Sequence, residues 1–345
     1  MSDTIYITRC PVPTPLGIAA HLGWFEDEFG PDGIAVASLQ DGRNDALRAS
    51  HIDHSLRHSF RQGGSIPALW AKSQGAATSV IGLTWIDEAQ LILALPGSGI
   101  RNVRDLRGRR VGLPSRPGQR IDIFRAAALR GFLGALSTEG LGARDVELVD
   151  VAAADPSRAE VPALGDHFAN PSSVTSRALY AAEAGALLRG EVDAIYAKGS
   201  LGLETAHLIG ARIVIDIGFH PDPLVRINNG SPRPLTVDTA FIDARPDLVA
   251  RILRRVTDVA AWGRAHPREV LDFLGLETGS THDWLRLAYR DDVHTRLETA
   301  LAPAAVTALS QFKDFLLAWG FLPHDFSVPG WIDHAVLDHK EAQCI

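Results

Sequence analysis

Hydrophobic and polar positions follow two alternating periods along the first part of the chain. Short apolar runs typical of strands alternate with longer segments whose apolar residues recur at helical spacing. The strand-like runs cover residues 5–8, 34–39, 80–83 and 90–95, and the helical ones cover 16–28 and 65–72. Because strands that alternate with helices form βαβ units, this pattern predicts an α/β protein built on parallel sheet.

The same pattern restarts near residue 91 and changes near residue 245. The second part contains expected strands at 110–113, 146–151, 194–196 and 212–217, and expected helices at 121–136 and 176–189. From residue 245 onward the apolar positions are helical, in 246–265, 267–274, 282–289 and 302–320. Residues 234–242 read as a strand that returns to the first part. We therefore predict two lobes, lobe I from 1–90 and 226–345 and lobe II from 91–225, with a helical C-terminal segment.

Composition and charge narrow the class of protein. The 345 residues are 46% hydrophobic and 22% charged, which is an ordinary balance for a globular protein. The net charge is −7 and no Lys or Arg cluster stands apart from acidic residues, so we expect no nucleic-acid or membrane partner. No run approaches the roughly 18 to 20 apolar residues that span a bilayer. We expect a monomer that acts on a small molecule.

The two cysteines and the first residues bear on localisation. Cys10 and Cys344 lie at opposite ends of the chain, and so few cysteines are typical of a reducing compartment. Residues 1–15 hold Asp3, Arg9 and three prolines, unlike the unbroken apolar stretch of a secretory signal. We therefore expect a cytoplasmic protein.

Cys10 is the first candidate for chemistry. It follows the first expected strand and precedes a turn through Pro11 and Pro13. Ligands of open α/β sheets collect beyond the carboxyl ends of strands, and the prolines would stiffen the turn. His51 could tune the protonation of this thiol, because a Cys–His pair is a recurrent way to do so. An inert buried thiol is the alternative, and we expect Cys344 to be inert.

The segment from Arg61 to Ser65 is a candidate anion site. Gly63 and Gly64 would let backbone N–H groups converge on an oxygen, and the helix that follows would add its positive end. The Arg61 guanidinium can hold two oxygens at once. A sulfinate, a phosphate or a carboxylate fits this arrangement, and a simple Gly-Gly turn is the alternative.

The histidines at 51, 54 and 58 raise the question of a metal. On one helix face, His51, His54 and His58 could bind zinc. We favour no metal, because no cysteine lies nearby and the interleaved residues are typical of an exposed segment. The stretch is expected to be solvated, with His54 and His58 near neutral on replacement.

Aromatic residues could line a pocket for an arene. We select Phe124 and Phe168, both in lobe II, because most other candidates lie on helices that need a core. Residues 152–176 are rich in Pro, Asp, Ser and Asn and are expected to form a long loop. This loop would either close over the site or serve as a disordered connection.

Two segments resemble the type II periplasmic-binding-protein fold, in its nitrate, sulfonate and taurine branch. Asp105–Pro114, Asp-Leu-Arg-Gly-Arg-Arg-Val-Gly-Leu-Pro, resembles the segment that opens the second lobe there. Ala186–Tyr196 resembles the helix-to-strand element that contains Gly-x-Val-Asp-Ala. Alone, this resemblance implies the two-lobed fold and a solute-binding protein.

A more specific resemblance is to the 2'-hydroxybiphenyl-2-sulfinate desulfinase family, cytoplasmic enzymes that complete sulfur removal from dibenzothiophene. Their Cys-Pro-Val-Pro, a histidine and an Arg-x-Gly-Gly-x-Ile-Pro ten positions later hold the catalytic residues. Here Cys10 opens Cys-Pro-Val-Pro, and Arg61 opens Arg-Gln-Gly-Gly-Ser-Ile-Pro ten positions after His51. Residues 52–60 and 114–138 depart from the family pattern, and the second of these segments could line the pocket.

The resemblance implies an aromatic sulfinate desulfinase that releases an arene and sulfite without a cofactor. Arg61 with the Gly63 and Gly64 amides would hold the sulfinate. Cys10 would act at the C–S bond, either as a thiol that protonates the ipso carbon or as a thiolate that attacks sulfur to give a thiosulfonate for hydrolysis. His51 would support either route. A solute-binding protein for sulfonate-like anions, a cytoplasmic sensor and a C–C lyase are the alternatives.

Overall fold

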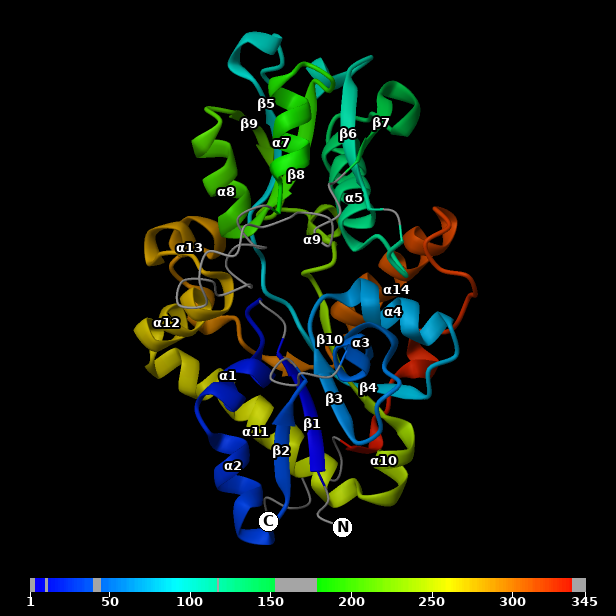
Figure 1. The fold of residues 1–345 in the computed structure, drawn as a ribbon, viewed down its shortest axis with the longest axis vertical. Helices are drawn as coiled ribbons and strands as arrows, with labels where there is room; N and C mark the ends of the chain where they lie inside the picture. The colour runs from blue at the N-terminus through cyan, green and yellow to red at the C-terminus, as the bar shows by residue number, and fades with distance from the viewer. Residues whose placement is uncertain (1–3, 10–11, 40–44, 117, 153–178, 337–345) are drawn as a thin grey trace. The chain divides into compact units, whose positions relative to one another are not determined.

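The computed structural model describes residues 4–9, 12–39, 45–116, 118–152 and 179–336. The chain forms two compact units (Figure 1). Unit 1 contains residues 1–86, 227–277 and 292–345, and unit 2 contains residues 87–226 and 278–291. The boundaries at 86 and 227 lie close to those expected from the sequence. The prediction that all of 226–345 belongs to lobe I is wrong for 278–291.

Unit 1 is built on a six-stranded mixed sheet with the order β11-β4-β10-β3-β1-β2. Its strands are β1 (Thr4–Arg9), β2 (Ala35–Ser38), β3 (Ser59–Gln62), β4 (Thr78–Thr84), β10 (Arg233–Asp238) and β11 (Thr299–Ala300). The first three strands are parallel to one another, whereas β10 runs antiparallel to both β3 and β4. The carboxyl ends of β1 and β3 therefore lie side by side at one edge.

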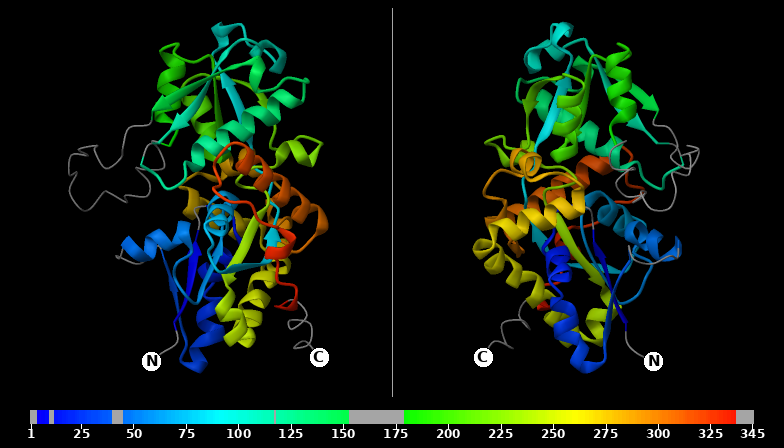
Figure 2. Two further views of the ribbon diagram at one scale, coloured as in Figure 1. Left: turned by 90° about the vertical axis from the view of Figure 1, so that its right-hand side faces the viewer. Right: turned by 60° about the vertical axis from the view of Figure 1, so that its left-hand side comes forward.

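Helices cover this sheet (Figure 2). They are α1 (Pro15–His21), α2 (Trp24–Phe29), α3 (Asp45–Asp53), α4 (Ser65–Ser73), α10 (Thr239–Ala244), α11 (Pro246–Ala265), α12 (Pro267–Thr278) and α14 (Pro303–Ala318). The single helix expected over 16–28 is two helices, because Gly23 adopts a φ of 75° that ends the first one. The expected strand over 234–242 ends at Asp238, whose carboxylate caps α10 by accepting a hydrogen bond from the Ala240 N–H.

Unit 2 is built on a five-stranded mixed sheet with the order β7-β6-β8-β5-β9. Its strands are β5 (Gln90–Ala94), β6 (Arg110–Ser115), β7 (Glu147–Ala152), β8 (Ala194–Lys198) and β9 (Arg212–Asp216). Strand β5 is antiparallel to β8 and β9, while β6, β7 and β8 are parallel. The expectation of parallel sheets is therefore wrong in one respect. Each sheet contains an antiparallel strand, β10 or β5, that closely follows a point where the chain passes between the units.

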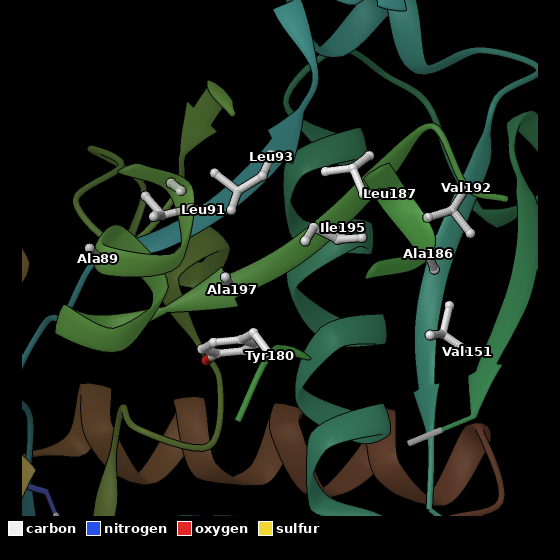
Figure 3. Close-up of a cluster of buried hydrophobic side chains, with 11 residues drawn as sticks. Ala89, Leu91, Leu93, Val151, Tyr180, Ala186, Leu187, Val192, Ile195 and Ala197 are labelled. Carbon is white, nitrogen blue, oxygen red and sulfur yellow. The ribbon is translucent and has the colours of Figure 1, made fainter. Parts of the chain in front are cut away.

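Five helices of the described part of unit 2 complete it. They are α5 (Ile123–Ser137), α7 (Ala181–Leu188), α8 (Gly199–Leu208), α9 (Pro223–Arg226) and α13 (His282–Tyr289). Alternate side chains of β8 face opposite ways, so Ile195 and Ala197 join a buried cluster with Leu91, Leu93 and residues of α7 and α8 (Figure 3). Burial of this cluster supplies the core that holds β8 in place.

Helix α13 explains why residues 278–291 belong to unit 2. It packs against α8, where the His207 and Trp284 rings lie 5.6 Å apart. The Ala89 N–H donates to the Ala288 carbonyl at 2.7 Å, and Ser280 Oγ donates to Glu204 at 2.7 Å. Helical periodicity alone carried no sign of which unit this helix would join. No described helix combines the length and apolar character needed to cross a membrane.

Candidate functional site

The carboxyl ends of β1 and β3 bring the predicted site segments of unit 1 together. Thr8 pairs with Arg61, and Arg9 pairs with Gln62, in a parallel register. Cys10 directly follows β1 and lies outside the described residues. Gly63 and Gly64 directly follow β3. The segments that carry Cys10 and the Gly-Gly turn therefore leave adjacent strands at the edge where ligands of open α/β sheets bind.

Arg61 ties the predicted site together through its guanidinium. The side chain is buried, with the residue 2% exposed. Its Nε donates to the His51 carbonyl at 2.8 Å, and its Nη2 donates to the Gly64 carbonyl at 3.1 Å. The structure thus brings the backbone carbonyls of His51 and Gly64 into contact with the Arg61 guanidinium. The roles expected for these three residues stay predictions. The Arg61 guanidinium also has a structural role, because its hydrogen bonds join the end of α3 to the turn that precedes α4.

The positive end of α4 is occupied by a residue distant in sequence. The Ser65 N–H donates to the Asn229 carbonyl at 2.9 Å, and the Ile66 N–H donates to Asn229 Oδ1 at 2.9 Å. The candidate anion site therefore differs from the expected one, in which the first N–H groups of α4 are available to an anion. Asn229 caps this end.

Gly64 is required for space and not for backbone conformation. Its φ of −54° and ψ of 140° suit any residue. A Cβ at this position would lie 2.4 Å from Asn229 Nδ2 and 2.7 Å from its Cγ. The glycine therefore allows the Asn229 amide to lie directly against the turn.

Gln62 is a functional candidate that the sequence did not single out. Its side chain is completely buried. Gln62 Oε1 accepts a hydrogen bond from the Leu16 N–H at 2.8 Å, and Nε2 donates to Thr84 at 2.9 Å. Leu16 is the second residue of α1, which follows the Cys-Pro-Val-Pro segment in the sequence, and Thr14 caps the same helix. Gln62 therefore holds the first turn of α1 against the strand that carries Arg61.

His54 and His58 do not behave as a solvated helical stretch. Helix α3 ends at Asp53, and both histidines adopt left-handed backbone conformations, each with a φ of 54°. His58 stacks on Phe241 with ring centroids 4.6 Å apart. The His54 ring is buried, with Nδ1 3.4 Å from Thr236 Oγ1. The expectation that the His54 side chain is solvated is therefore wrong, whereas the expectation that its replacement leaves turnover nearly unchanged stays a prediction.

The surroundings of His54 favour its neutral form in the folded protein. Burial lowers the pKa of His54 well below its usual range, and the nearby Arg61 and His51 lower it further. The free energy of unfolding of the wild-type protein should therefore decrease as the pH falls below about 6.5. In that range His54 binds a proton in the unfolded chain but not in the folded protein. The contribution approaches about 1.4 kcal/mol per pH unit. Denaturant unfolding at a series of pH values checks this.

The matching variant for that measurement is His54→Gln, which cannot titrate. It should be less stable than wild type above neutral pH, because a buried hydrogen-bonding group is replaced. Its stability should fall less steeply on acidification. Equal slopes for the two proteins would contradict a neutral, buried His54.

In unit 2, the predicted pocket residue Phe124 lies against a small cavity of about 20 Å³. The Arg116 guanidinium stacks on the Phe124 ring at 3.5 Å. Glu183, only 2% exposed, lines the same cavity, and burial raises the pKa of its carboxyl. Phe168 lies outside the described residues. This cavity has room for little more than a water molecule. The role of Phe124 in binding an arene stays a prediction.

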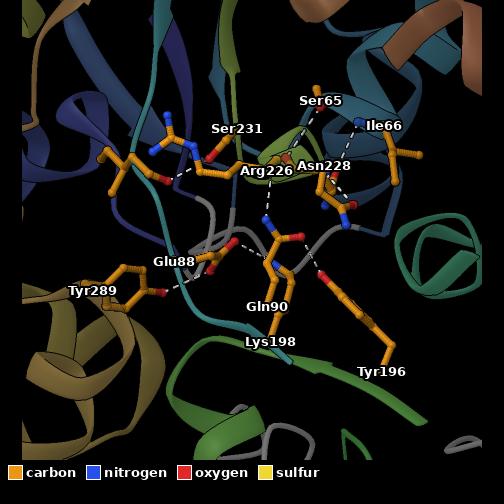
Figure 4. Close-up of polar contacts among 12 residues, drawn as sticks. Ser65, Ile66, Glu88, Gln90, Tyr196, Lys198, Arg226, Asn228, Ser231 and Tyr289 are labelled. Atoms are coloured by element: carbon orange, nitrogen blue, oxygen red, sulfur yellow. Dashed lines mark hydrogen bonds and ion pairs between the residues drawn. The ribbon is translucent and has the colours of Figure 1, made fainter. Parts of the chain in front are cut away.

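Polar residues at the carboxyl end of β8 form a network in unit 2 (Figure 4). Lys198 Nζ lies 2.6 Å from Glu88 Oε1, and the Tyr289 hydroxyl donates to Glu88 Oε2 at 3.3 Å. The Tyr196 hydroxyl donates to Gln90 Oε1 at 2.9 Å. These contacts satisfy buried polar groups that would otherwise be costly. No group of three or more His, Cys, Asp or Glu side chains among the described residues is arranged to hold a metal ion.

Known proteins resemble this chain in sequence and in structure. Residues 11–164 match the family model described as NMT1/THI5 like. A protein of Bacillus subtilis (strain 168), whose name assigns it to aliphatic-sulfonate binding, is 33% identical over 105 residues. That match spans 29% of this chain and 30% of the Bacillus protein. It covers less than a third of either chain.

Solved structures match along nearly the whole chain. A cysteine-to-serine mutant of DSZB in complex with biphenyl-2-sulfinic acid matches with a TM-score of 0.74 and 23% identity, over 99% of this chain and 100% of that one. The desulfurization enzyme DSZB itself matches with a TM-score of 0.73, at the same identity and coverage. The periplasmic aliphatic sulphonate binding protein SsuA from Escherichia coli matches with a TM-score of 0.64 and 14% identity, over 97% of this chain and 93% of that one. The chain therefore has the type II periplasmic-binding-protein fold that its sequence resemblance implied, a fold also found in DSZB and in sulfonate-binding proteins.

Proposed function

We propose that this protein is an aromatic sulfinate desulfinase, which converts an arene sulfinate and water into the arene and sulfite. One observation carries the proposal. Buried Arg61 contacts His51 and Gly64 at the end of β3, beside the strand that leads into Cys10. The DSZB mutant that holds biphenyl-2-sulfinic acid supports the same reading, because it shares this fold.

Arg61 suits a sulfinate for physical reasons. A planar guanidinium offers donors in a fixed plane, which matches two oxygens on one sulfur. Its backbone contacts hold that plane still, so little conformational freedom is lost when the anion binds. Burial strengthens the attraction, because few waters compete for the charge.

Cys10 is assigned the bond-breaking step. As a thiol it would protonate the ipso carbon while the C–S electron pair moves to that carbon; sulfur dioxide would leave, and water would convert it to sulfite. As a thiolate it would attack sulfur; the C–S bond would break with its electron pair on the aryl carbon, which takes a proton, and the SO2 group left on the Cys10 sulfur would be hydrolysed by water to sulfite and the free thiol. His51 would accept or return the proton in either route. Both routes need a reduced thiol, which is why the proposal includes a cytoplasmic location.

The test is release of sulfite from an aromatic sulfinate by purified protein without added cofactor. Biphenyl-2-sulfinate and benzenesulfinate are the first substrates, with sulfite and arene measured in equal amounts. Activity should survive chelation and dialysis, because Cys10, His51 and Arg61 supply the proton, the nucleophile and the charge. Restoration of lost activity by one divalent ion would contradict the proposal.

His51→Gln should slow turnover while the protein stays folded. The His51 backbone carbonyl still receives the Arg61 Nε hydrogen bond in this variant, since glutamine changes only the side chain. The expected loss is about 100-fold or more in kcat, which is the usual effect of removing a proton-transfer group. His58→Gln is the control, because its ring stacks on Phe241 away from the Arg61 contacts. Equal losses for both variants would contradict a special role of His51.

A binding protein for sulfonate-like anions is the second candidate. The Bacillus match favours it, because that protein is named for aliphatic sulfonates. Binding of a sulfonate or sulfinate without any product would support this candidate. Stoichiometric sulfite release would exclude it as the whole function.

A further inference from the structure

We propose that the side-chain amide of Asn229 donates a hydrogen bond to the bound oxyanion, beside Arg61. This inference rests on the proposed function and adds a residue that the Arg-Gln-Gly-Gly motif does not contain. Asn229 lies 168 positions after Arg61 in the sequence, and the structure brings it to the turn.

The hydrogen bonds of Asn229 fix which way its amide points. Oδ1 accepts from the Ile66 N–H at 2.9 Å, which leaves Nδ2 as the donor end of the amide, against Gly64. The backbone is also held, since its N–H donates to Asn228 Oδ1 at 2.8 Å and its carbonyl accepts from the Ser65 N–H. Figure 4 shows the contacts of Ser65 and Ile66 at this end of the helix. The amide is therefore preorganised without a ligand.

Nδ2 is a donor placed beside the predicted anion seat. It would lie 2.4 Å from a Cβ at position 64, so it takes the space that a side chain of Gly64 would fill. Arg61 Nη2 donates to the carbonyl of the same Gly64. Among the described residues, Nδ2 itself makes no hydrogen bond. Two donor groups, a guanidinium and an amide, thus flank one glycine.

The amide also carries the electrostatic effect of α4 outward. A helix N-terminus is positive because its first N–H groups lack partners within the helix. Here Asn229 Oδ1 accepts from one of these groups, and hydrogen bonds in series polarise one another. The positive end of the helix is therefore displayed at Nδ2, where a sulfinate, sulfite or sulfonate oxygen would be attracted.

Asn229→Asp separates this role from that of a helix cap. The introduced carboxylate can still accept from the Ile66 N–H, and a negative charge at a helix N-terminus is favourable, so the melting temperature should not fall. The donor, however, is replaced by a negative charge that repels the anion. Asn102→Asp is the matched control, because Asn102 is an exposed cap that accepts from the Arg104 N–H, and the net charge changes equally.

The measurement is calorimetric titration of benzenesulfinate into Cys10→Ser protein, alone and with each second substitution. Asn229→Asp should weaken binding about 30-fold or more, as expected when a charge-assisted contact is lost. Affinity should recover as acid protonates the introduced carboxyl. Asn102→Asp should bind like the parent. If the parent binds and Asn229→Asp binds equally well, the Asn229 assignment fails alone; if the parent binds no benzenesulfinate, the proposed function fails as well.

Discussion

Replacement of Cys10 by serine is expected to lower the rate of sulfite release by about three orders of magnitude or more, while sulfinate binding persists. A serine hydroxyl is a far weaker acid than a thiol and a far weaker nucleophile than a thiolate, so either chemical route is blocked. The volume at this position changes little. Binding is expected to persist because it is assigned to Arg61 and the neighbouring turn.

The measurement is the sulfite assay together with calorimetric titration of the same samples. Cys344→Ser is the control, since Cys344 is the second cysteine and is predicted to be inert. It should retain wild-type turnover. A Cys10→Ser enzyme that keeps more than about a tenth of the wild-type rate would remove Cys10 from the chemistry, because loss of an essential group costs far more.

The elements that could be predicted are those with a strong local period. Strand β1 and helices α11 and α13 lie where the apolar pattern placed them, because each buries one face against its own unit. Helix α11 buries Leu248, Ile252, Val256 and Val259 at spacings of three and four. A regular apolar face must be buried for the helix to be stable, so the sequence alone indicates both the helix and its buried side.

Strand β3 escaped prediction because its burial is polar. All four of its residues are buried, yet only Phe60 is apolar. Ser59 Oγ donates to the Leu56 carbonyl at 2.7 Å, and Gln62 and Arg61 make the contacts described above. Such burial is stable only when each polar group finds a partner. Those partners come from other segments, so a local pattern cannot reveal them.

The candidate site likewise has a part that the sequence indicates and a part that only the structure shows. The ten-residue spacing from His51 to Arg61 is local information, and it made both residues candidates; the structure adds that Arg61 Nε donates to the His51 carbonyl. The capping of α4 by Asn229 joins residues 163 positions apart, and the contact of His54 with Thr236 joins residues 182 apart. Only the pairing of β10 with β3 and β4 brings these partners together. Tertiary structure, and not motif spacing, decides which donors lie beside the Gly63–Gly64 turn.

Arg61→Lys should weaken sulfinate binding almost as much as Arg61→Ala. One ammonium cannot replace Nε and Nη2, which donate to two carbonyls in different segments, and also present a plane of donors to an anion. The expected loss is about 30-fold to several thousand-fold in affinity, which corresponds to roughly 2 to 5 kcal/mol. Titration of benzenesulfinate into Cys10→Ser protein with each substitution measures it, and thermal unfolding of the same samples shows whether the fold is kept.

Arg57→Ala is the matched control for this experiment. Arg57 lies four positions before Arg61 but is exposed, whereas Arg61 is buried at the end of β3. An exposed cation contributes little to a distant site, because solvent and salt screen its charge. Arg57→Ala should therefore bind sulfinate like the parent protein. If Arg57→Ala abolishes binding while Arg61→Ala preserves it, the anion is held elsewhere, and the roles assigned to His51, Gly64 and Asn229 lose their basis.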